Sequence, residues 1–317
     1  MAHYSRTQHR ERTRLRHAVE YGLLRAVALP LEWLPLRAAL WIGRRLGDFT
    51  YGGLRLRQRV ALENLRAALG PELDNAELSR IARATYQHAG MTFVEFLRFG
   101  REGRAGLMDR TTVRPLAVLE QATVPGHGII YLTSHTGNWE LCGVVMGGLG
   151  GSVDGVVGDQ KNLWVDRYVK RLRGRAGVQM IPIGSALREV MRRLGAGGRV
   201  VLAADQDGGR DGVLLDFLGR PASCQAGPAR FAYRSGAAVV VCLDRHLGDG
   251  RHEILLHPPI VPRRDLPEGE EVARILSESN RHLEAFVRRY PDQWFWMHRR
   301  WKSGTERVAA GESVCVG

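Results

Sequence analysis

The sequence predicts an α/β fold with a mostly parallel sheet flanked by helices, and two observations carry this prediction. From about residue 110 onward, short apolar runs alternate with amphipathic stretches of helical length. The 317 residues are 44% hydrophobic and 25% charged, which excludes a disordered or collagen-like chain and allows a sizeable core. Alternation of strands and helices is typical of βαβ units, whose strands are parallel.

Five apolar runs have the length of buried strands. They are GIIYLT (128–133), VQMIPI (178–183), RVVLAA (199–204), AAVVVCL (237–243) and EILL (253–256). The stretches between and after them are predicted to be helices, at 139–147, 163–174, 186–195, 225–235 and 270–290. In one of them, Leu187, Val190, Met191 and Leu194 recur at i, i+3, i+4 and i+7, the spacing of one helix face.

The N-terminal third is predicted to be helical. Helices are expected over 55–69 and 77–98, separated by the breaker pair Gly70-Pro71. We expect a junction between this region and the α/β core at Arg101 to Gly106. The predicted division is a basic flexible arm (1–16), a helical region (17–105), an α/β core (106–303) and a tail (304–317).

The chain is strongly basic, with a net charge of +13 and a pI near 10.3. Such a charge indicates an acidic partner, which can be nucleic acid, an anionic membrane, or an acidic protein or substrate. Residues 1–66 hold 13 arginines and 5 acidic residues, so +8 of the excess is N-terminal. A nucleic-acid-binding protein is the alternative that the charge alone suggests, but no helix-turn-helix, zinc or aromatic-stacking signature supports it.

The segment 21–49 favours the surface of a membrane. It is rich in Leu, Ala and Trp, but charged residues interrupt it before any run reaches the length of a span. Pro30 and Pro35 should break or kink a helix there, and no signal peptide is evident. Trp33 and Trp41 beside arginines and leucines suit an interfacial amphipathic helix. The alternative is two short helices packed on the protein's own core.

The sequence SHTGNWE (134–140) is the candidate site, because chemistry in open α/β sheets collects just past the carboxyl ends of strands. His135 leaves the first core strand, and Glu140 falls in the first turn of the next helix. A carboxylate on one imidazole nitrogen fixes the tautomer and makes the other nitrogen a general base. Free N–H groups at the helix start can stabilise an oxyanion. The alternative is a structural histidine on a βα turn.

Other chemistries lack their signatures. The four cysteines form no C-x-x-C pair, and no H-x-x-x-H or Cys/His cluster indicates a metal hydrolase. No G-x-S-x-G is present, which counts against an esterase or lipase. We therefore expect neither a metal nor a cofactor.

With this block identified, the chain resembles the late acyltransferases of lipid A biosynthesis (lauroyl and myristoyl transferases) and the related phosphatidylinositol mannoside acyltransferases, within the lysophospholipid acyltransferase-like superfamily. The resemblance covers roughly residues 18–303. Five blocks carry it: VALENLRAAL (60–69), LTSHTGNWE (132–140), KNLWVDRYVKRLRGRAGVQMIP (161–182), LAADQDGGRDGVLLDFLGRPASCQAGPARFAYRSGAAVV (202–240) and PDQWFWMHRRWK (291–302).

The resemblance implies a glycerol-phosphate-acyltransferase-like core and transfer of an acyl chain from a thioester to a hydroxyl of a glycolipid. The donor would be an acyl carrier protein or coenzyme A thioester. The acceptor would be a lipid A precursor, with a phosphatidylinositol mannoside or another lysolipid as the alternative. The reaction would take place at the cytoplasmic face of the inner membrane, on an anionic surface, with no nucleic acid involved.

The resemblance also implies roles for particular residues. His135 would be the general base, Glu140 its orienting carboxylate, and Asn138 would help to shape the site. Asp205 and Gln206 would close the site from a neighbouring strand end, or else form a hydrogen-bonded turn. The basic block supplies candidates for binding the phosphates of an acidic acceptor, and its alternative role is a solvated helix face. These candidates are Arg167, Arg173 and Arg175.

Overall fold

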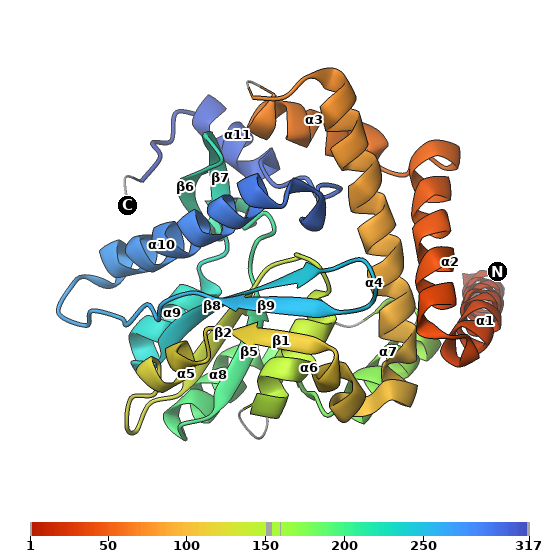
Figure 1. The fold of residues 1–317 in the computed structure, drawn as a ribbon, viewed down its shortest axis with the longest axis horizontal. Helices are drawn as coiled ribbons and strands as arrows, with labels where there is room; N and C mark the ends of the chain where they lie inside the picture. Colours follow the sequence, from red (N-terminus) through yellow and green to blue (C-terminus); the bar gives the residue numbers. More distant parts are fainter. Residues whose placement is uncertain (1, 71, 150–153, 159, 316–317) are drawn as a thin grey trace.

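The computed structural model describes residues 2–70, 72–149, 154–158 and 160–315, with side chains from Arg14 onward. Its centre is a seven-stranded sheet with the order β1-β9-β8-β2-β5-β3-β4 (Figure 1). Every neighbouring pair in this sheet is parallel except β8 and β9. The predicted α/β class with a mostly parallel sheet is thus confirmed.

The bounds of the sheet strands follow the apolar runs closely. Five of them are β2 (Ile129–Thr133), β4 (Gln179–Pro182), β5 (Arg199–Ala203), β8 (Ala238–His246) and β9 (His252–Leu256). The other two are β1 (Thr111–Arg114) and β3 (Asp154–Val157), which were not predicted from the sequence. Both are four residues long, and neither is a continuous apolar run, so pairing with the neighbouring strand defines them.

Helices cover both faces of the sheet, and strand β2 shows how. Ile130 and Leu132 join the core formed with α8 (Ala186–Gly195), α9 (Gly227–Ser235) and α10 (Glu268–Arg289). Ile129 and Tyr131 point the other way, into a core with α5 (Ala117–Gln121), α6 (Trp139–Leu149) and the end of α4 (Asn75–Asp109). Burial of both faces explains why the strand is a continuous apolar run.

The N-terminal helices lie outside the sheet. They are α1 (Ala2–Trp33), α2 (Leu36–Asp48), α3 (Gln58–Leu69) and α4 (Asn75–Asp109), with a short π-helical turn at Phe49–Gly53. The long helix α4 stands between the sheet and the pair α1 and α2 (Figure 1). Pro30 lies inside α1, and the break comes at Pro35, which precedes α2.

Small residues let α2 and α4 approach at backbone distance. A Cβ on Gly43 would lie 2.8 Å from the carbonyl oxygen of Gly90, and one on Gly47 would lie 2.2 Å from that of Tyr86. Helix α4 is capped by Asp74, whose side chain accepts from the backbone N–H of Glu77 at 2.8 Å. It runs through the predicted junction at 101–106, with a non-helical residue at Gly103.

A two-stranded hairpin outside the main sheet was also missed. It pairs β6 (Val213–Phe217) with β7 (Arg220–Cys224). Its turn is Leu218-Gly219, with φ of 52° and 74°. Turns of this kind usually carry Asn-Gly or Asp-Gly, so Leu-Gly gave no turn signal. The remaining helices are α7 (Leu163–Arg175) and α11 (Lys302–Ala309), with single 3₁₀ turns at Ile183–Ser185, Gly209–Asp211 and Pro291–Gln293.

The predicted division into arm, helical region, core and tail stays a prediction. Residues 2–16 belong to α1, and only the last three of them have described side chains. Among the described residues, no helix is both long and apolar enough to cross a bilayer. In α8, Val190 and Leu194 are buried as their spacing predicts, whereas Leu187 is 60% exposed.

Candidate active site

Two neighbouring parallel strands bring the key side chains together. Strands β2 and β5 pair in parallel, with Thr133 opposite Ala203 at their carboxyl ends. His135 lies two residues beyond β2, and Asp205 lies two residues beyond β5. Equal offsets from paired strand ends place the two residues at the same edge of the sheet, where they meet.

Asp205 holds His135 through both of its carboxylate oxygens. Its Oδ1 accepts from Nδ1–H of His135 at 2.7 Å, and its Oδ2 accepts from the backbone N–H of His135 at 2.9 Å. The indole N–H of Trp294 donates to the same Oδ2 at 2.8 Å. Asp205 is buried, so these three donors replace the water it has lost. The ring of His135 is therefore fixed in the tautomer that leaves Nε2 as an acceptor.

Electrostatics reinforce this pair. Burial works to lower the pKa of His135, but the attraction and hydrogen bond of Asp205 outweigh it, and the pKa is raised. Burial works to raise the pKa of Asp205, but His135 and the other donors hold it well below its usual range. Asp205 is thus ionised at neutral pH, and its charge favours an imidazolium when His135 takes up a proton.

Glu140 is not the hydrogen-bond partner of His135, which corrects the expectation from the sequence. Its carboxylate forms a two-point ion pair with Arg173, at 2.9 Å from Nε and 2.5 Å from Nη2. Glu140 is the second residue of α6, where its side chain faces α7 rather than the strand end. It still adds to the raised pKa of His135 at longer range. The carboxylate that accepts hydrogen bonds from His135 is that of Asp205.

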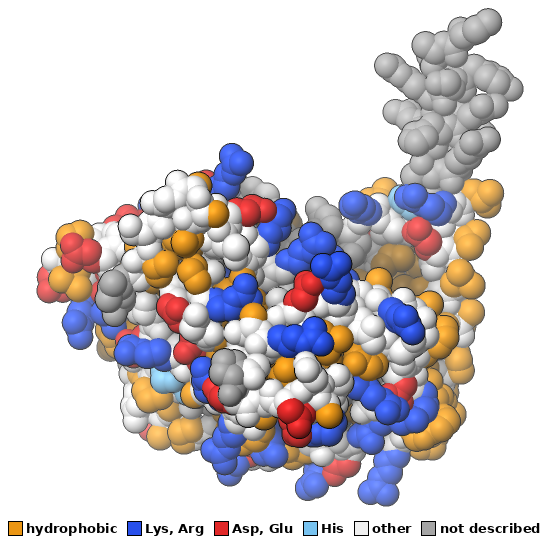
Figure 2. All heavy atoms as spheres, turned by 90° about the horizontal axis from the view of Figure 1, so that it is seen from above, with side chains coloured by type: hydrophobic (Ala, Val, Ile, Leu, Met, Phe, Trp, Pro, Cys, Tyr) orange, Lys and Arg blue, Asp and Glu red, His pale blue; other side chains and the backbone are white. Residues whose placement is uncertain are grey.

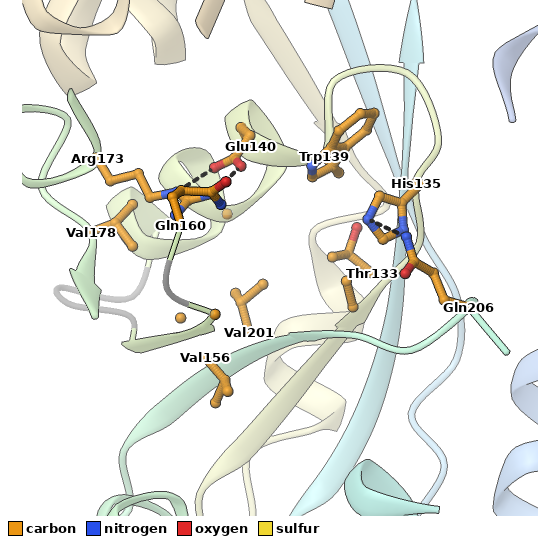
Figure 3. A pocket seen from close by; sticks show the side chains of 14 residues that line it. Thr133, His135, Trp139, Glu140, Val156, Gln160, Arg173, Val178, Val201 and Gln206 are labelled. Atoms are coloured by element: carbon orange, nitrogen blue, oxygen red, sulfur yellow. Dashed lines mark hydrogen bonds and ion pairs between the residues drawn. The ribbon is translucent and has the colours of Figure 1, made fainter. Parts of the chain in front are cut away.

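A cavity of about 450 Å³ opens beside His135, and it is lined partly by polar and partly by apolar residues (Figure 3). His135 and Gln206 lie on one side, and Glu140, Arg173 and Gln160 lie together on the other. Between and below them the wall is made of small or apolar residues. These are Gly143, Gly155, Val156, Val178, Val201 and Ala203. The cavity therefore has polar groups on two opposite sides and an apolar wall between them.

The remaining predicted site residues fall into two groups. Gln206 lines the cavity, with its Nε2 at 3.4 Å from Nε2 of His135, and Arg173 lines it as the partner of Glu140. Arg167 and Arg175 are exposed and do not line the cavity, which fits the alternative of a solvated helix face. Asn138 is fully buried behind the turn and also lies outside the cavity.

The turn that carries His135 depends on Gly137. Its φ is +48°, and a Cβ there would lie 2.3 Å from Oδ2 of Asp244. Only glycine satisfies both conditions. The carbonyl of Gly137 accepts from the hydroxyl of Thr92 at 2.9 Å, and its N–H donates to the carbonyl of Gln293. The turn is thus held by α4 and by the C-terminal segment.

Several residues that build the site were not predicted from the sequence. Trp294 donates to Asp205, and the backbone N–H of Phe295 donates to the carbonyl of His135 at 3.0 Å. Trp139 lies against the His135 ring, with 4.9 Å between ring centroids. The block PDQWFWMHRRWK contained the signal, since it belongs to the resemblance, but nothing in its spacing assigned Trp294 to Asp205.

An α/β layer fold with a half-buried histidine held by a buried carboxylate at the edge of a parallel sheet, beside a partly apolar cavity, defines a class of site suited to acyl transfer. Residues 8–303 match the family described as bacterial lipid A biosynthesis acyltransferase. The chain belongs to this acyltransferase family.

Three relatives illustrate its range. A phosphatidylinositol mannoside acyltransferase of Mycolicibacterium smegmatis is 28% identical over 203 residues, covering 63% of this chain and 64% of that protein. A lipid A biosynthesis palmitoleoyltransferase of Escherichia coli is 26% identical over 279 residues, covering 85% and 87%. A lipid A biosynthesis lauroyltransferase of the same organism is 24% identical over 280 residues, covering 87% and 89%. The aligned region thus spans just under two thirds of the mycobacterial protein.

Proposed function

We propose that this chain is an O-acyltransferase that moves a fatty acyl group from an acyl thioester to a hydroxyl of a glycolipid, in particular a lipid A precursor. The observation that carries the proposal is the fixed His135 that lines the cavity, with its Nδ1–H donated to Asp205. Membership in an acyltransferase family sets the reaction class.

The proposed reaction is direct attack. Nε2 of His135 takes the proton of the acceptor hydroxyl, and the oxygen attacks the carbonyl carbon of the thioester. The tetrahedral intermediate collapses by breaking the C–S bond, and the thiolate leaving group takes the proton back from the imidazolium. The Asp205 carboxylate stabilises that imidazolium while it exists. Charge on the intermediate oxygen is offset by the N-terminal end of α6, which begins at Trp139 beside His135.

The two linings of the cavity suit the two ends of an acyl thioester. The small and apolar wall formed by Val156, Val178 and Val201 fits a hydrocarbon chain. The Glu140–Arg173 pair lines the side opposite His135, where it can orient a hydroxyl or an anionic group of a substrate. Arg167 and Arg175 on the exposed face of α7 are proposed to approach acceptor phosphates at the surface.

A membrane-bound acceptor fits the outer face of α1 and α2. Apolar side chains gather along the edge of the molecule where these helices lie, interspersed with arginines (Figure 2). Trp33 is 72% exposed and Trp41 is 63% exposed, a costly arrangement in water and a favourable one at a bilayer interface. We propose peripheral binding to the anionic cytoplasmic face of the inner membrane.

The named relatives suggest two classes of lipid as the acceptor of the acyl group. The lipid A palmitoleoyltransferase and lauroyltransferase favour a lipid A precursor, and both align over more than four fifths of this chain. The mycobacterial relatives favour a phosphatidylinositol mannoside or another lysolipid as the alternative acceptor. An acyl carrier protein and coenzyme A are both anionic thioester carriers, so the basic surface suits either one.

The test is a transfer assay with both donors and both acceptors, with the products weighed by mass spectrometry. His135→Ala should lower the rate by about 10²- to 10⁴-fold, the usual contribution of a general base. His282→Ala is the matched control, because His282 is a half-buried histidine on α10, outside the cavity.

Near wild-type transfer by His135→Ala would overturn the proposed chemistry. Strong, salt-sensitive DNA affinity with no thioester consumption by any donor would instead support the nucleic-acid alternative.

A further inference from the structure

A buried cluster of charged residues lies directly behind the turn that carries His135. It is formed by Glu95 of α4, Asp244 of β8 and His252 of β9, with Arg110 at the end of α4. Glu95 and Asp244 are fully buried, and His252 is 1% exposed. Charged groups this deep are retained only when they are paired, so the partners of each one define what the cluster does.

His252 bridges the two carboxylates. Its Nδ1 lies 2.8 Å from Oδ2 of Asp244, and its Nε2 lies 3.0 Å from Oε1 of Glu95. Both acceptors are carboxylate oxygens, so both ring nitrogens donate and the ring is an imidazolium. Burial works to lower the pKa of His252, but the attraction of Asp244 and Glu95 outweighs it and raises the pKa to about 10.

The same two carboxylates hold the residue three positions after His135. Oε2 of Glu95 accepts from Nδ2 of Asn138 at 2.9 Å. Oδ2 of Asp244 accepts from the backbone N–H of Asn138 at 2.6 Å. Oδ1 of Asn138 in turn accepts from the N–H of Leu141 at 3.0 Å and caps α6. Asn138 therefore joins the cluster to both the turn and the first turn of α6.

We propose that His252 is a positioning residue for acyl transfer, because it holds Glu95 and Asp244 as the acceptors that clamp Asn138 and so fix the His135 turn against Asp205. This inference rests on the proposed function of His135. Without the bridging cation, two buried carboxylates would repel each other across a short distance, and the clamp on Asn138 would loosen.

The alternative role for such a cluster is to bind a metal ion, since ligand atoms of Glu95, His246 and His252 lie within 4.8 Å of one another. The hydrogen bonds argue against it. Oε1 of Glu95 already accepts from His252 and, at 2.7 Å, from Nη1 of Arg110. A metal ion would have to displace two donors and sit beside a guanidinium. The geometry points to a hydrogen-bonded charge cluster.

The test compares His252→Gln with His246→Gln in the transfer assay. Glutamine is neutral and cannot donate to both carboxylates, so kcat should fall by about 10- to 100-fold, the cost of a small displacement of a catalytic group. KM for the acyl donor should change by less than about threefold, because neither residue lines the cavity. His246 is the matched control, since it is equally buried but its Nε2 is 3.6 Å from Glu95 and makes no hydrogen bond there in the described structure.

The pH profile separates positioning from simple loss of folded protein. Asp205, Glu140 and His298 are the titratable groups that act on His135, and Asp205 dominates. A looser turn weakens the His135–Asp205 pair, so the acidic limb of the kcat profile should move to lower pH in His252→Gln. It should stay in place in His246→Gln. Fewer folded molecules would lower the amplitude without moving the limb.

A second variant covers the case in which His252→Gln does not fold. The double variant Glu95→Gln/His252→Gln removes a negative charge together with the positive one, so it leaves fewer unpaired buried charges. It should recover folding but keep the reduced kcat. Wild-type kcat and an unmoved acidic limb in the folded variant would overturn the inference, as would stoichiometric zinc binding that His246→Gln abolishes. His135→Ala, assayed in parallel, reports separately on the proposed function.

Discussion

At the scale of single residues, one carboxylate determines how His135 can act. Asp205 accepts from both the ring Nδ1 and the backbone N–H of His135, so it fixes the position of the turn as well as the tautomer. The spacing of five residues made Glu140 the expected partner, and Glu140 instead neutralises Arg173. The distinction matters for experiments, because the two carboxylates should have different effects when removed.

Asp205→Asn should reduce kcat by about 10²-fold or more and shift the acidic limb of the rate profile to lower pH. The negative charge of Asp205 stabilises the imidazolium, so its loss lowers the pKa of His135, and the base becomes free at lower pH. The measurement is kcat against pH for both proteins. An acidic limb that moves to higher pH would contradict the assigned pair.

Glu140 and Arg173 should behave as one unit. Glu140→Gln leaves a largely buried guanidinium without its ion-pair partner, and Arg173→Gln leaves the carboxylate alone. In a double-mutant cycle on the free energy of unfolding, we expect a coupling energy between about 0.5 and 3 kcal/mol. If the effects of the two single substitutions on the free energy of unfolding simply add up in the double variant, Glu140 and Arg173 do not act as one unit. A Glu140–Asp205 cycle provides the comparison, because the structure gives those residues no direct hydrogen bond.

At the scale of elements, the site depends on how strand ends and helix faces meet. The cavity wall is formed by α6, β3, β5, α7 and the loop that follows α7. These elements are separated along the chain and meet only in the folded protein. Small residues set its width. A Cβ on Gly155 would meet only Val178, at the ordinary contact distance of 3.5 Å, so a larger side chain there would extend into the cavity.

Gly155→Leu should shorten the acyl chain that the enzyme prefers. The added side chain occupies the apolar part of the cavity, while His135 and Asp205 are untouched. Competition between donors of different chain length, read by mass spectrometry, gives the preference. Gly174→Leu is the control, since Gly174 lies on α7 in open space and does not line the cavity. An unchanged preference in Gly155→Leu would show that the chain lies elsewhere.

The contact between α2 and α4 makes a second prediction at this scale. Gly47→Ala should destabilise the protein by about 1–3 kcal/mol, because the new methyl group would meet the backbone of α4. Gly22→Ala in α1 has open space around it and should be neutral or stabilising by up to about 1 kcal/mol. Chemical denaturation measures both. Equal effects would contradict the close approach of the two helices.

At the scale of the whole molecule, basic residues and exposed apolar residues occur together in the N-terminal helices. The excess charge of +8 falls within residues 1–66, the stretch that also holds the exposed Trp33 and Trp41. The basic residues alone left nucleic acid and membrane open as partners. Their position beside exposed tryptophan and leucine favours an anionic lipid surface, where both kinds of side chain contribute.

Trp41→Glu should weaken binding to vesicles that contain anionic lipid by about 10-fold or more, because it removes a large apolar side chain from the interface and adds a negative charge. Vesicle sedimentation at several salt concentrations measures this. Leu187→Glu is the matched control, since Leu187 is 60% exposed on α8, on a different part of the molecule. Equal losses in both variants would contradict the proposed membrane face.

The sequence by itself determined the fold class, the long core strands, the family resemblance and the position of His135 after β2. These features depend on local periodicity and on short contiguous blocks, so they are visible in one dimension. Tertiary structure decided which carboxylate pairs with His135, the burial of Asn138 against Glu95 and Asp244, and the exclusion of Arg167 and Arg175 from the cavity. Each of these depends on how segments far apart in the sequence pack together. Asp205 is 70 residues from His135 in sequence, and only the parallel pairing of β2 with β5 brings their side chains into contact.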